Sequence, residues 1–189
     1  VAALEHHSVA FNVGVNRRFA GLFTTARRMI AEGEFGDVKW AQFTGNDLLM
    51  HGYSHAFDAI CYLLGDPPAR WIAGQVAPYR GPTGAALACC YDPETNRWDR
   101  DPGGCWATIA FEGGAMGQAA NPTGMPMYEW QVVGTRGVLH IRDYGEKVVW
   151  RRGDGYDKPE TPFPEYPPKS PTVALIEDLV RGMETGEPT

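Results

Sequence analysis

Gly45-Asn-Asp-Leu-Leu-Met-His-Gly-Tyr-Ser-His-Ala-Phe-Asp-Ala-Ile-Cys-Tyr-Leu-Leu-Gly65 is the stretch that decides how the rest of the chain is interpreted. A helix that begins near Gly52 would end at Gly65, because that glycine is followed by Asp66-Pro67-Pro68. Its apolar positions recur at helical spacing, at Ala56, Phe57, Ile60, Leu63 and Leu64. The stretch therefore predicts a largely buried helix.

The start of this helix carries acid–base side chains. His55 and Asp58 are three residues apart and share a helix face, and His51 comes one turn earlier. Imidazole has an ordinary pKa of about 6.5, so a histidine near a carboxylate can exchange a proton at neutral pH. Two other interpretations stay open: a packed or capping histidine, and a zinc or iron site without a marked fourth ligand. We favour proton transfer and expect no metal.

Charge and composition narrow the class of partner. The 189 residues carry 17 basic and 23 acidic side chains, a net charge of −6, and no basic run. This balance argues against a nucleic-acid or anionic-membrane surface and favours a small-molecule partner. No apolar run reaches the roughly 20 residues that cross a bilayer. The four cysteines show no Cys-x-x-Cys spacing, so we expect reduced thiols and a cytoplasmic setting.

The remaining elements follow from periodicity and from turn residues. We predict helices at 20–32 and from Thr172 to about Gly182, and strands at 8–15, 37–44, 69–77, 104–112, 115–120, 127–133, 138–142 and 147–150. The last five strands, separated by tight glycine turns, suggest an antiparallel meander. Residues 78–103 are expected to form a long loop in which Tyr91 and Trp98 could act as a lid.

The sum is an α+β fold, a mostly antiparallel open sheet covered on one face by helices. The uncovered face would need a partner, and we expect alternating positions such as Cys105, Ile109, Trp130 and Val132 to make it apolar enough to bind another copy. The glycines of Gly113-Gly114-Ala-Met-Gly117 faintly suggest a dinucleotide loop, but that fingerprint requires a following helix, and Asn121-Pro122 arrives too soon. We interpret it as a hairpin.

Several motifs in this order resemble one family. They are Asn16-Arg-Arg-Phe19, Met29-Ile-Ala-Glu-Gly-Glu-Phe-Gly36, His55-x-x-Asp58 with Leu63-Leu64-Gly65, Gly134-Thr-Arg-Gly137, and Ala174-Leu-Ile-Glu-Asp-Leu-Val-Arg-Gly-Met183 with Gly186-Glu-Pro188. Together they resemble the C-terminal domain of the Gfo/Idh/MocA oxidoreductases, which is similar to the C-terminal domain of glyceraldehyde-3-phosphate dehydrogenase. The resemblance covers nearly the whole chain, except for the loop at 79–103.

The resemblance implies a two-domain NAD- or NADP-dependent dehydrogenase of sugars or cyclitols. Residues 1–15 would be the remnant of an N-terminal Rossmann domain that binds most of the cofactor. Residues 16–189, with an insertion at 79–103 and a C-terminal helix at 172–185, would bind substrate and oligomerise through the open sheet face. We therefore expect a piece of a longer protein that is inactive alone.

The resemblance also suggests roles for the site residues. His55 would be the acid or base on the substrate hydroxyl, assisted by His51, while Arg17, Tyr53 and Asp58 would contact or orient the substrate. His51 stands where the family usually has an aspartate, which would alter the proton relay; Asp47 lies one turn earlier and could replace that carboxylate. Two alternatives remain: a non-catalytic dimerisation scaffold, and an NAD-dependent glycosidase or lyase.

Overall fold

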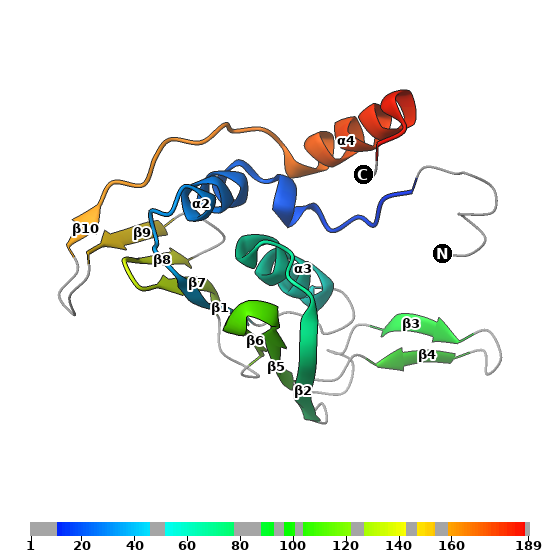
Figure 1. Ribbon diagram of the computed structural model, residues 1–189. Helices are drawn as coiled ribbons and strands as arrows, with labels where there is room; N and C mark the ends of the chain where they lie inside the picture. Colours follow the sequence, from blue (N-terminus) through cyan, green and yellow to red (C-terminus); the bar gives the residue numbers. More distant parts are fainter. Residues whose placement is uncertain are drawn as a thin grey trace.

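Eight strands form one open sheet in the order β10-β9-β8-β7-β1-β6-β5-β2 (Figure 1). The structure is a computed structural model and describes residues 11–45, 52–77, 88–92, 97–100, 104–121, 127–142, 147–153 and 159–187. The sheet strands are β1 (Val38–Gly45), β2 (Ala69–Ala77), β5 (Gly104–Phe111), β6 (Met116–Ala120), β7 (Tyr128–Gly134), β8 (Gly137–Arg142), β9 (Lys147–Arg152) and β10 (Glu160–Thr161).

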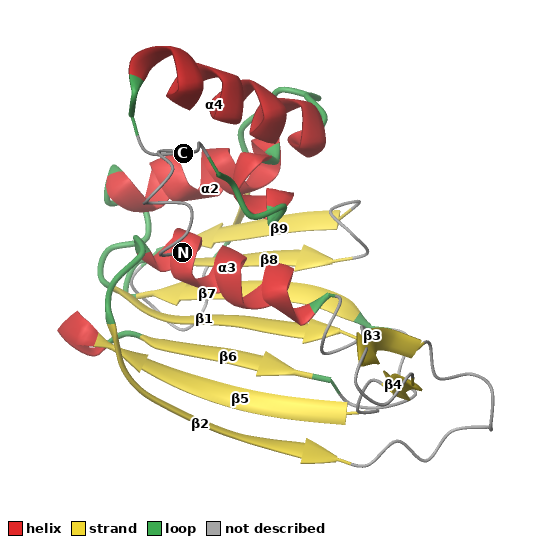
Figure 2. Ribbon diagram, turned by 90° about the vertical axis from the view of Figure 1, so that its right-hand side faces the viewer, coloured by secondary structure: helices red, strands yellow, loops and turns green. Residues whose placement is uncertain are grey.

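Neighbouring strands of this sheet are antiparallel except for β1 and β6, which run parallel. A short 3₁₀ turn η1 (Asn16–Phe19) precedes α2 (Gly21–Ala31), and α3 (Tyr53–Leu64) follows β1. Figure 2 shows α2 and α3 on one face of the sheet, with α4 (Pro171–Thr185) further out. The predicted α+β fold, a mostly antiparallel open sheet with helices on one face, is confirmed.

The core lies between the sheet and these two helices. Along β1, Ala41 and Phe43 are buried while the alternate residues are partly exposed, as the two-residue period of a strand requires. The Phe43 ring centroid lies 4.6 Å from that of Trp130 on β7, and the Trp130 centroid lies 5.2 Å from that of Phe23 on α2. This aromatic cluster joins the sheet to α2.

The glycines between β5 and β6 have structural roles. Gly113 and Gly114, in the 3₁₀ turn η2 (Glu112–Gly114), have positive φ angles of 83° and 86°, which favour glycine. A Cβ atom on Gly117 would lie 2.6 Å from Cγ2 of Ile60, so this glycine lets α3 approach the sheet closely. A strand follows the turn, as a hairpin requires and a dinucleotide loop does not.

Three predictions of connectivity differ from the structure. The last strands do not form one meander, because β1 lies between β6 and β7 and pairs with both. The stretch 78–103 contains a hairpin of β3 (Ala88–Asp92) and β4 (Arg97–Arg100), in which Tyr91 pairs with Trp98; the lid stays a prediction. Residues 11–15 are not in a strand, since no described strand lies beside them, and residues 8–10 lie outside the described part.

The prediction for the open face was also wrong. Cys105, Ile109, Trp130 and Val132 are buried in the core that the helices cover. The opposite face instead carries a polar row across three strands: Gln42 Nε2 donates to Gln131 Oε1 over 2.9 Å, and Gln131 Nε2 lies 2.7 Å from His140 Nε2. The alternation of residues along the strands assigned these four side chains to one face correctly. That face is the one that the helices cover, because it is the more apolar of the two.

Candidate functional site

Helix α3 places His55 in its first turn. The helix is capped by Gly52 and ends at Gly65, whose φ of 97° is left-handed, as the sequence predicts. It buries one face, formed by Tyr53, Ala56, Ala59, Ile60 and Leu63. His55 lies beside this face and is half-buried, so the imidazole is neither sealed in the core nor fully in solvent.

Tyr53 belongs to the core in this structure. Its side chain is fully buried, its ring centroid lies 5.7 Å from that of Phe43, and its hydroxyl donates to the carbonyl oxygen of Gly45 over 3.2 Å. These contacts fix the start of α3 to the end of β1. A contact between Tyr53 and substrate stays a prediction. His51 lies outside the described residues, and its role also stays a prediction.

Arg17 reaches the same end of β1 from the turn η1. Its Nη2 donates to the Tyr128 hydroxyl over 2.6 Å, and its guanidinium carbon lies 5.4 Å from the centroid of the Tyr128 ring. Tyr128 pairs with Gly45 across β7 and β1, which places Arg17 close to the start of α3. A guanidinium with donors to spare can hold a carboxylate, a phosphate or a sugar hydroxyl.

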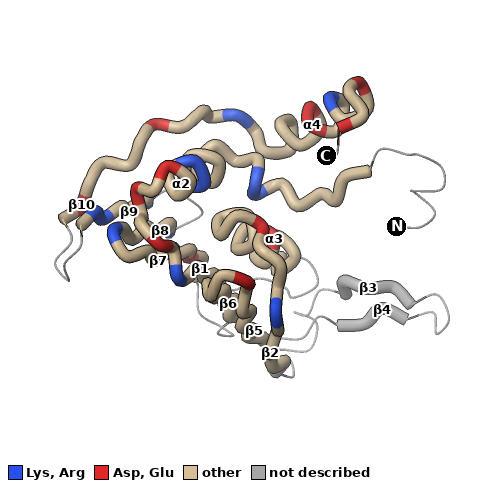
Figure 3. The backbone as a smooth tube through the Cα atoms, viewed as in Figure 1, with Lys and Arg blue, Asp and Glu red and all other residues tan. Residues whose placement is uncertain are grey.

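Asp58 is held by Arg18, a partner that the sequence analysis did not assign. Arg18 Nε lies 3.1 Å and 3.0 Å from Asp58 Oδ1 and Oδ2, and its Nη2 lies 2.5 Å from Oδ1. The same Nη2 lies 3.2 Å from Asp66, and the guanidinium carbon lies 5.3 Å from the centroid of the Tyr62 ring. In Figure 3 the turn η1, drawn partly in blue, lies near α3, which carries a red segment.

The Arg18 contacts and the burial of neighbouring groups shift pKa values along α3. The hydrogen bonds that Arg18 donates to Asp58 raise the pKa of Arg18, against the opposing effect of burial. On the same helix, burial raises the pKa of the Cys61 thiol and of the Tyr62 hydroxyl, which disfavours a reactive thiolate. A cavity of about 360 Å³ opens beside the ion pair, lined by residues between Phe11 and Phe19 and by Asp58.

The structure places four of the five candidate residues in or next to α3: Tyr53 and His55 in its first turn, Asp58 near its middle and Arg17 in the turn η1. His51 is outside the described part, and the roles of all five stay predictions. Arg18 was missed although the doublet Arg17-Arg18 was noted. In a 3₁₀ turn, successive side chains point in different directions, so the two arginines have different partners.

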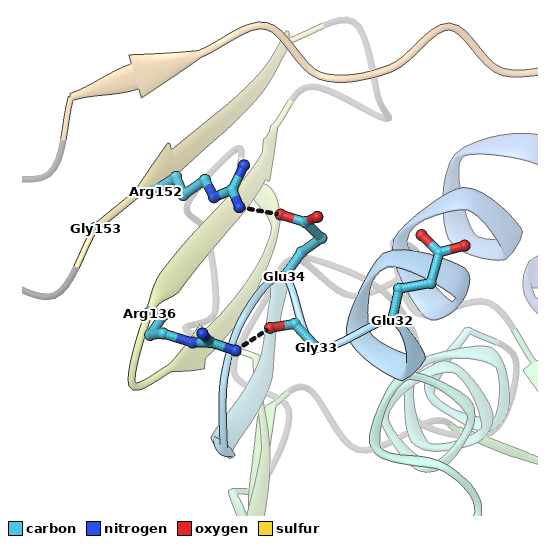
Figure 4. A pocket seen from close by; sticks show the side chains of 6 residues that line it. All are labelled: Glu32, Gly33, Glu34, Arg136, Arg152 and Gly153. Carbon is cyan, nitrogen blue, oxygen red and sulfur yellow. Dashed lines mark hydrogen bonds and ion pairs between the residues drawn. The ribbon is translucent and has the colours of Figure 1, made fainter.

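A second cavity, of about 430 Å³, lies at the far end of α2 (Figure 4). Two contacts join its lining residues: Arg136 Nη2 donates to the carbonyl oxygen of Gly33 over 2.8 Å, and Arg152 Nη2 lies 3.1 Å from Glu34 Oε2. The predicted Gly134–Gly137 motif has a packing role here, because a Cβ atom on Gly134 would lie 2.2 Å from the carbonyl oxygen of Phe35. These contacts stabilise the turns.

Within the described residues, no three His, Cys, Asp or Glu side chains are grouped so that they could hold a metal ion. In the same residues, no helix has the length and apolar character needed to cross a membrane.

Comparison with known proteins supports the fold. No family model and no curated protein matches the chain. Solved structures do match, among them an NAD-binding oxidoreductase from Klebsiella pneumoniae (19% identity, TM-score 0.67, covering 99% of this chain and 60% of that one). An aldose-aldose oxidoreductase from Caulobacter crescentus, complexed with glycerol, matches at 16% identity and TM-score 0.68, covering 99% and 57%.

A levoglucosan dehydrogenase, in complex with NADH and levoglucosan, matches at 15% identity and TM-score 0.69, covering all of this chain and 60% of that one. The chain thus spans about three-fifths of the length of these oxidoreductases. At these identities the likeness shows a shared fold, one that occurs in NAD(P)-dependent oxidoreductases, some of which act on sugars.

Proposed function

We propose that this chain is the substrate-binding part of a Gfo/Idh/MocA-type NAD(P)-dependent oxidoreductase, in which His55 exchanges a proton with the hydroxyl of a sugar or cyclitol. The observation that carries the proposal is the half-buried His55 in the first turn of α3, three residues before Asp58, on a helix whose start is joined to the end of β1 where Tyr128 meets Arg17. The likeness to oxidoreductases that act on sugars supports the substrate class.

The residues of this chain fit the substrate better than the cofactor. In the described residues, the glycines with positive φ end helices, lead into strands or lie in the turns after strands, and none of them directly begins an α-helix as the glycine loop that binds a dinucleotide pyrophosphate does. NAD or NADP would therefore be bound mainly by sequence beyond this chain, where it would supply the hydride acceptor.

His55 has the chemistry that alcohol oxidation needs from the protein. A neutral imidazole accepts the hydroxyl proton as the alcohol becomes a ketone and returns it in the reverse reaction. Arg17, anchored at Tyr128, would orient substrate oxygens next to the ring. The 189-residue chain alone would be inactive, since it would have no hydride acceptor in place.

The test is His55→Ala in the full-length protein, assayed by nicotinamide absorbance against a panel of sugars and cyclitols with NAD and with NADP. We expect kcat to fall about 100- to 10,000-fold, while His140→Ala, which changes a histidine on the opposite face of the sheet, leaves kcat unchanged. An unaltered kcat in His55→Ala would refute the role of His55. Cleavage of a labelled glycoside with catalytic NAD would instead support the glycosidase or lyase alternative.

We also propose that a second copy packs on the open sheet face. Trp40 and the polar row Gln42–Gln131–His140 lie there, and Trp71 and Trp106 are 50% and 47% exposed on the β2 and β5 side. Burying about 800 Å² per partner is typical of a stable interface. Sedimentation velocity of the full-length protein would refute this proposal, and with it the scaffold alternative, if only monomer were found.

A further inference from the structure

We infer that Arg18 is a positioning residue that sets the proton affinity of His55 through Asp58. The inference rests on the proposed role of His55 and extends it to a residue outside the substrate contacts. The two arginines of η1 have different partners: Arg17 donates to the Tyr128 hydroxyl, whereas Arg18 donates to the carboxylate of Asp58 on α3, the helix that carries His55.

The contact between Arg18 and Asp58 is geometrically restrictive. Both carboxylate oxygens accept hydrogen bonds from the guanidinium, and the side chains of Arg18 and Asp58 are 30% and 13% exposed. Asp66 and the Tyr62 ring hold the same guanidinium from the far end of α3. A planar guanidinium held on three sides keeps Asp58 in one rotamer, which a lysine, with a single point charge, cannot do equally well.

Asp58 lies one helical turn from His55, so the two side chains are neighbours on the surface of α3. An unpaired carboxylate at that distance would favour the protonated, positively charged form of His55, and an unpaired guanidinium would disfavour that form. Because Arg18 and Asp58 are paired, their effects on His55 largely cancel. The pair therefore leaves His55 available as a neutral base at the pH where a cell works.

The other charged or titratable groups near the start of α3 enter the same balance. Arg17 from η1 adds a positive charge beside Tyr128 of β7. Cys61 and Tyr62 lie further along α3, and Asp66 lies just past its end. These groups are unchanged in the variants below. Asp66 would partly compensate Arg18 when Asp58 is neutralised, so the two single substitutions are expected to have unequal effects.

The test measures the titration of the His55 ring by NMR and the pH dependence of kcat/KM in the full-length protein. The His55 signal is identified by its loss in His55→Gln. We expect Arg18→Gln to raise the His55 pKa and Asp58→Asn to lower it, each by up to about 1 pH unit. The acidic limb of the kcat/KM profile should move in the same directions, because oxidation requires the neutral ring.

Two further variants separate this role from a purely structural one. The double variant Arg18→Gln/Asp58→Asn should bring the titration back towards the wild-type value, although it lacks both partners. Arg18→Lys should keep the wild-type pKa more closely than Arg18→Gln does. Arg28→Gln is the matched control, because Arg28 is an exposed helical arginine paired with Glu32, and it should leave the titration unchanged.

Shifts in the same direction for Arg18→Gln and Asp58→Asn, or no shift in either, would overturn the inference. If Arg18→Gln does not fold, the other two variants decide. The inference fails unless Asp58→Asn lowers the pKa of His55 and the double variant brings that pKa back towards the wild-type value. The proposed function fails separately. A fully active His55→Ala variant with the predicted shifts would refute catalysis by His55 and leave the electrostatic coupling in place.

Discussion

Gly117 offers a direct test of how α3 is seated on the sheet. In β6 this residue faces the helix, and a Cβ atom there would lie 2.6 Å from Cγ2 of Ile60 and 3.0 Å from Cε2 of Phe111. Both neighbours are buried, at 0% and 1% exposure. Neither is the free end of a flexible side chain, so the substitution Gly117→Ala must displace the helix or the strand.

The expected cost follows from these contacts. Overpacking a core by one methyl group costs about 1–3 kcal/mol, while replacing glycine by alanine gains about 0.4–1 kcal/mol from the unfolded chain. The net loss of unfolding free energy should then be about 1–2 kcal/mol. With a urea m value of about 2 kcal/mol/M, the midpoint of unfolding would fall by roughly 0.5–1 M.

The assay is equilibrium urea unfolding followed by tryptophan fluorescence. Gly14→Ala is the matched control: Gly14 has nothing within 4 Å of the added atom, so its midpoint should stay the same or rise slightly. Ile60→Ala removes the clashing methyl, so Gly117→Ala should cost less in that background. A Gly117→Ala midpoint equal to that of wild type, or a cost that Ile60→Ala does not reduce, would refute the packing argument.

Three other outcomes are expected. Burial, together with the positive charges of Arg142 and Arg151, lowers the pKa of His140 in the folded state. Protonation of His140 therefore favours the unfolded state, and the free energy of unfolding should fall as the pH drops below about 6.5. In His140→Gln the urea midpoint should fall less over the same pH range. If the proposed function holds, Arg17→Ala in the full-length protein should raise KM for substrate at least about tenfold, with Arg28→Ala as the control, and an unchanged KM would contradict a substrate contact. Gln131→Arg should convert an oligomer to monomers in sedimentation velocity, because it buries an unpaired charge at the centre of the open face; an unchanged sedimentation coefficient would argue for a different interface.

Local sequence patterns predicted most individual elements but not their assembly. The periodicity of Leu22, Phe23, Ala26 and Met29 gave α2, and the Gly65-Asp-Pro-Pro68 signal gave the end of α3, because both depend on neighbours in sequence. The insertion of β1 between β6 and β7 depends on pairing across some 75 to 95 residues, for which no local signal exists. The two-residue β10 is too short to show any period.

At the candidate site, too, the sequence predicted the local features but not the contacts between distant residues. The helix start and the spacing of His55 and Asp58 are local, and the sequence predicted both. The partner of Asp58 is 40 residues away in the chain, so either arginine of the doublet was an equally good candidate. Tyr53 and Tyr128 look alike in sequence, and both are buried in the core, yet the Tyr53 hydroxyl anchors α3 to β1 and the Tyr128 hydroxyl meets Arg17, because only the fold decides which partner each hydroxyl reaches.

The position of the site follows from the one parallel pair in the sheet. A chain that leaves β1 and returns as β6, parallel to it, must cross over one face, and α3 lies on that crossover. Its first turn therefore comes just after the carboxyl end of β1, beside the start of the antiparallel β7 with Tyr128. Open sheets commonly bind ligands at the carboxyl ends of parallel strands. This topology places the first turn of α3, which carries His55, beside Tyr128 and its partner Arg17, while the Arg18–Asp58 pair lies one helical turn further along α3.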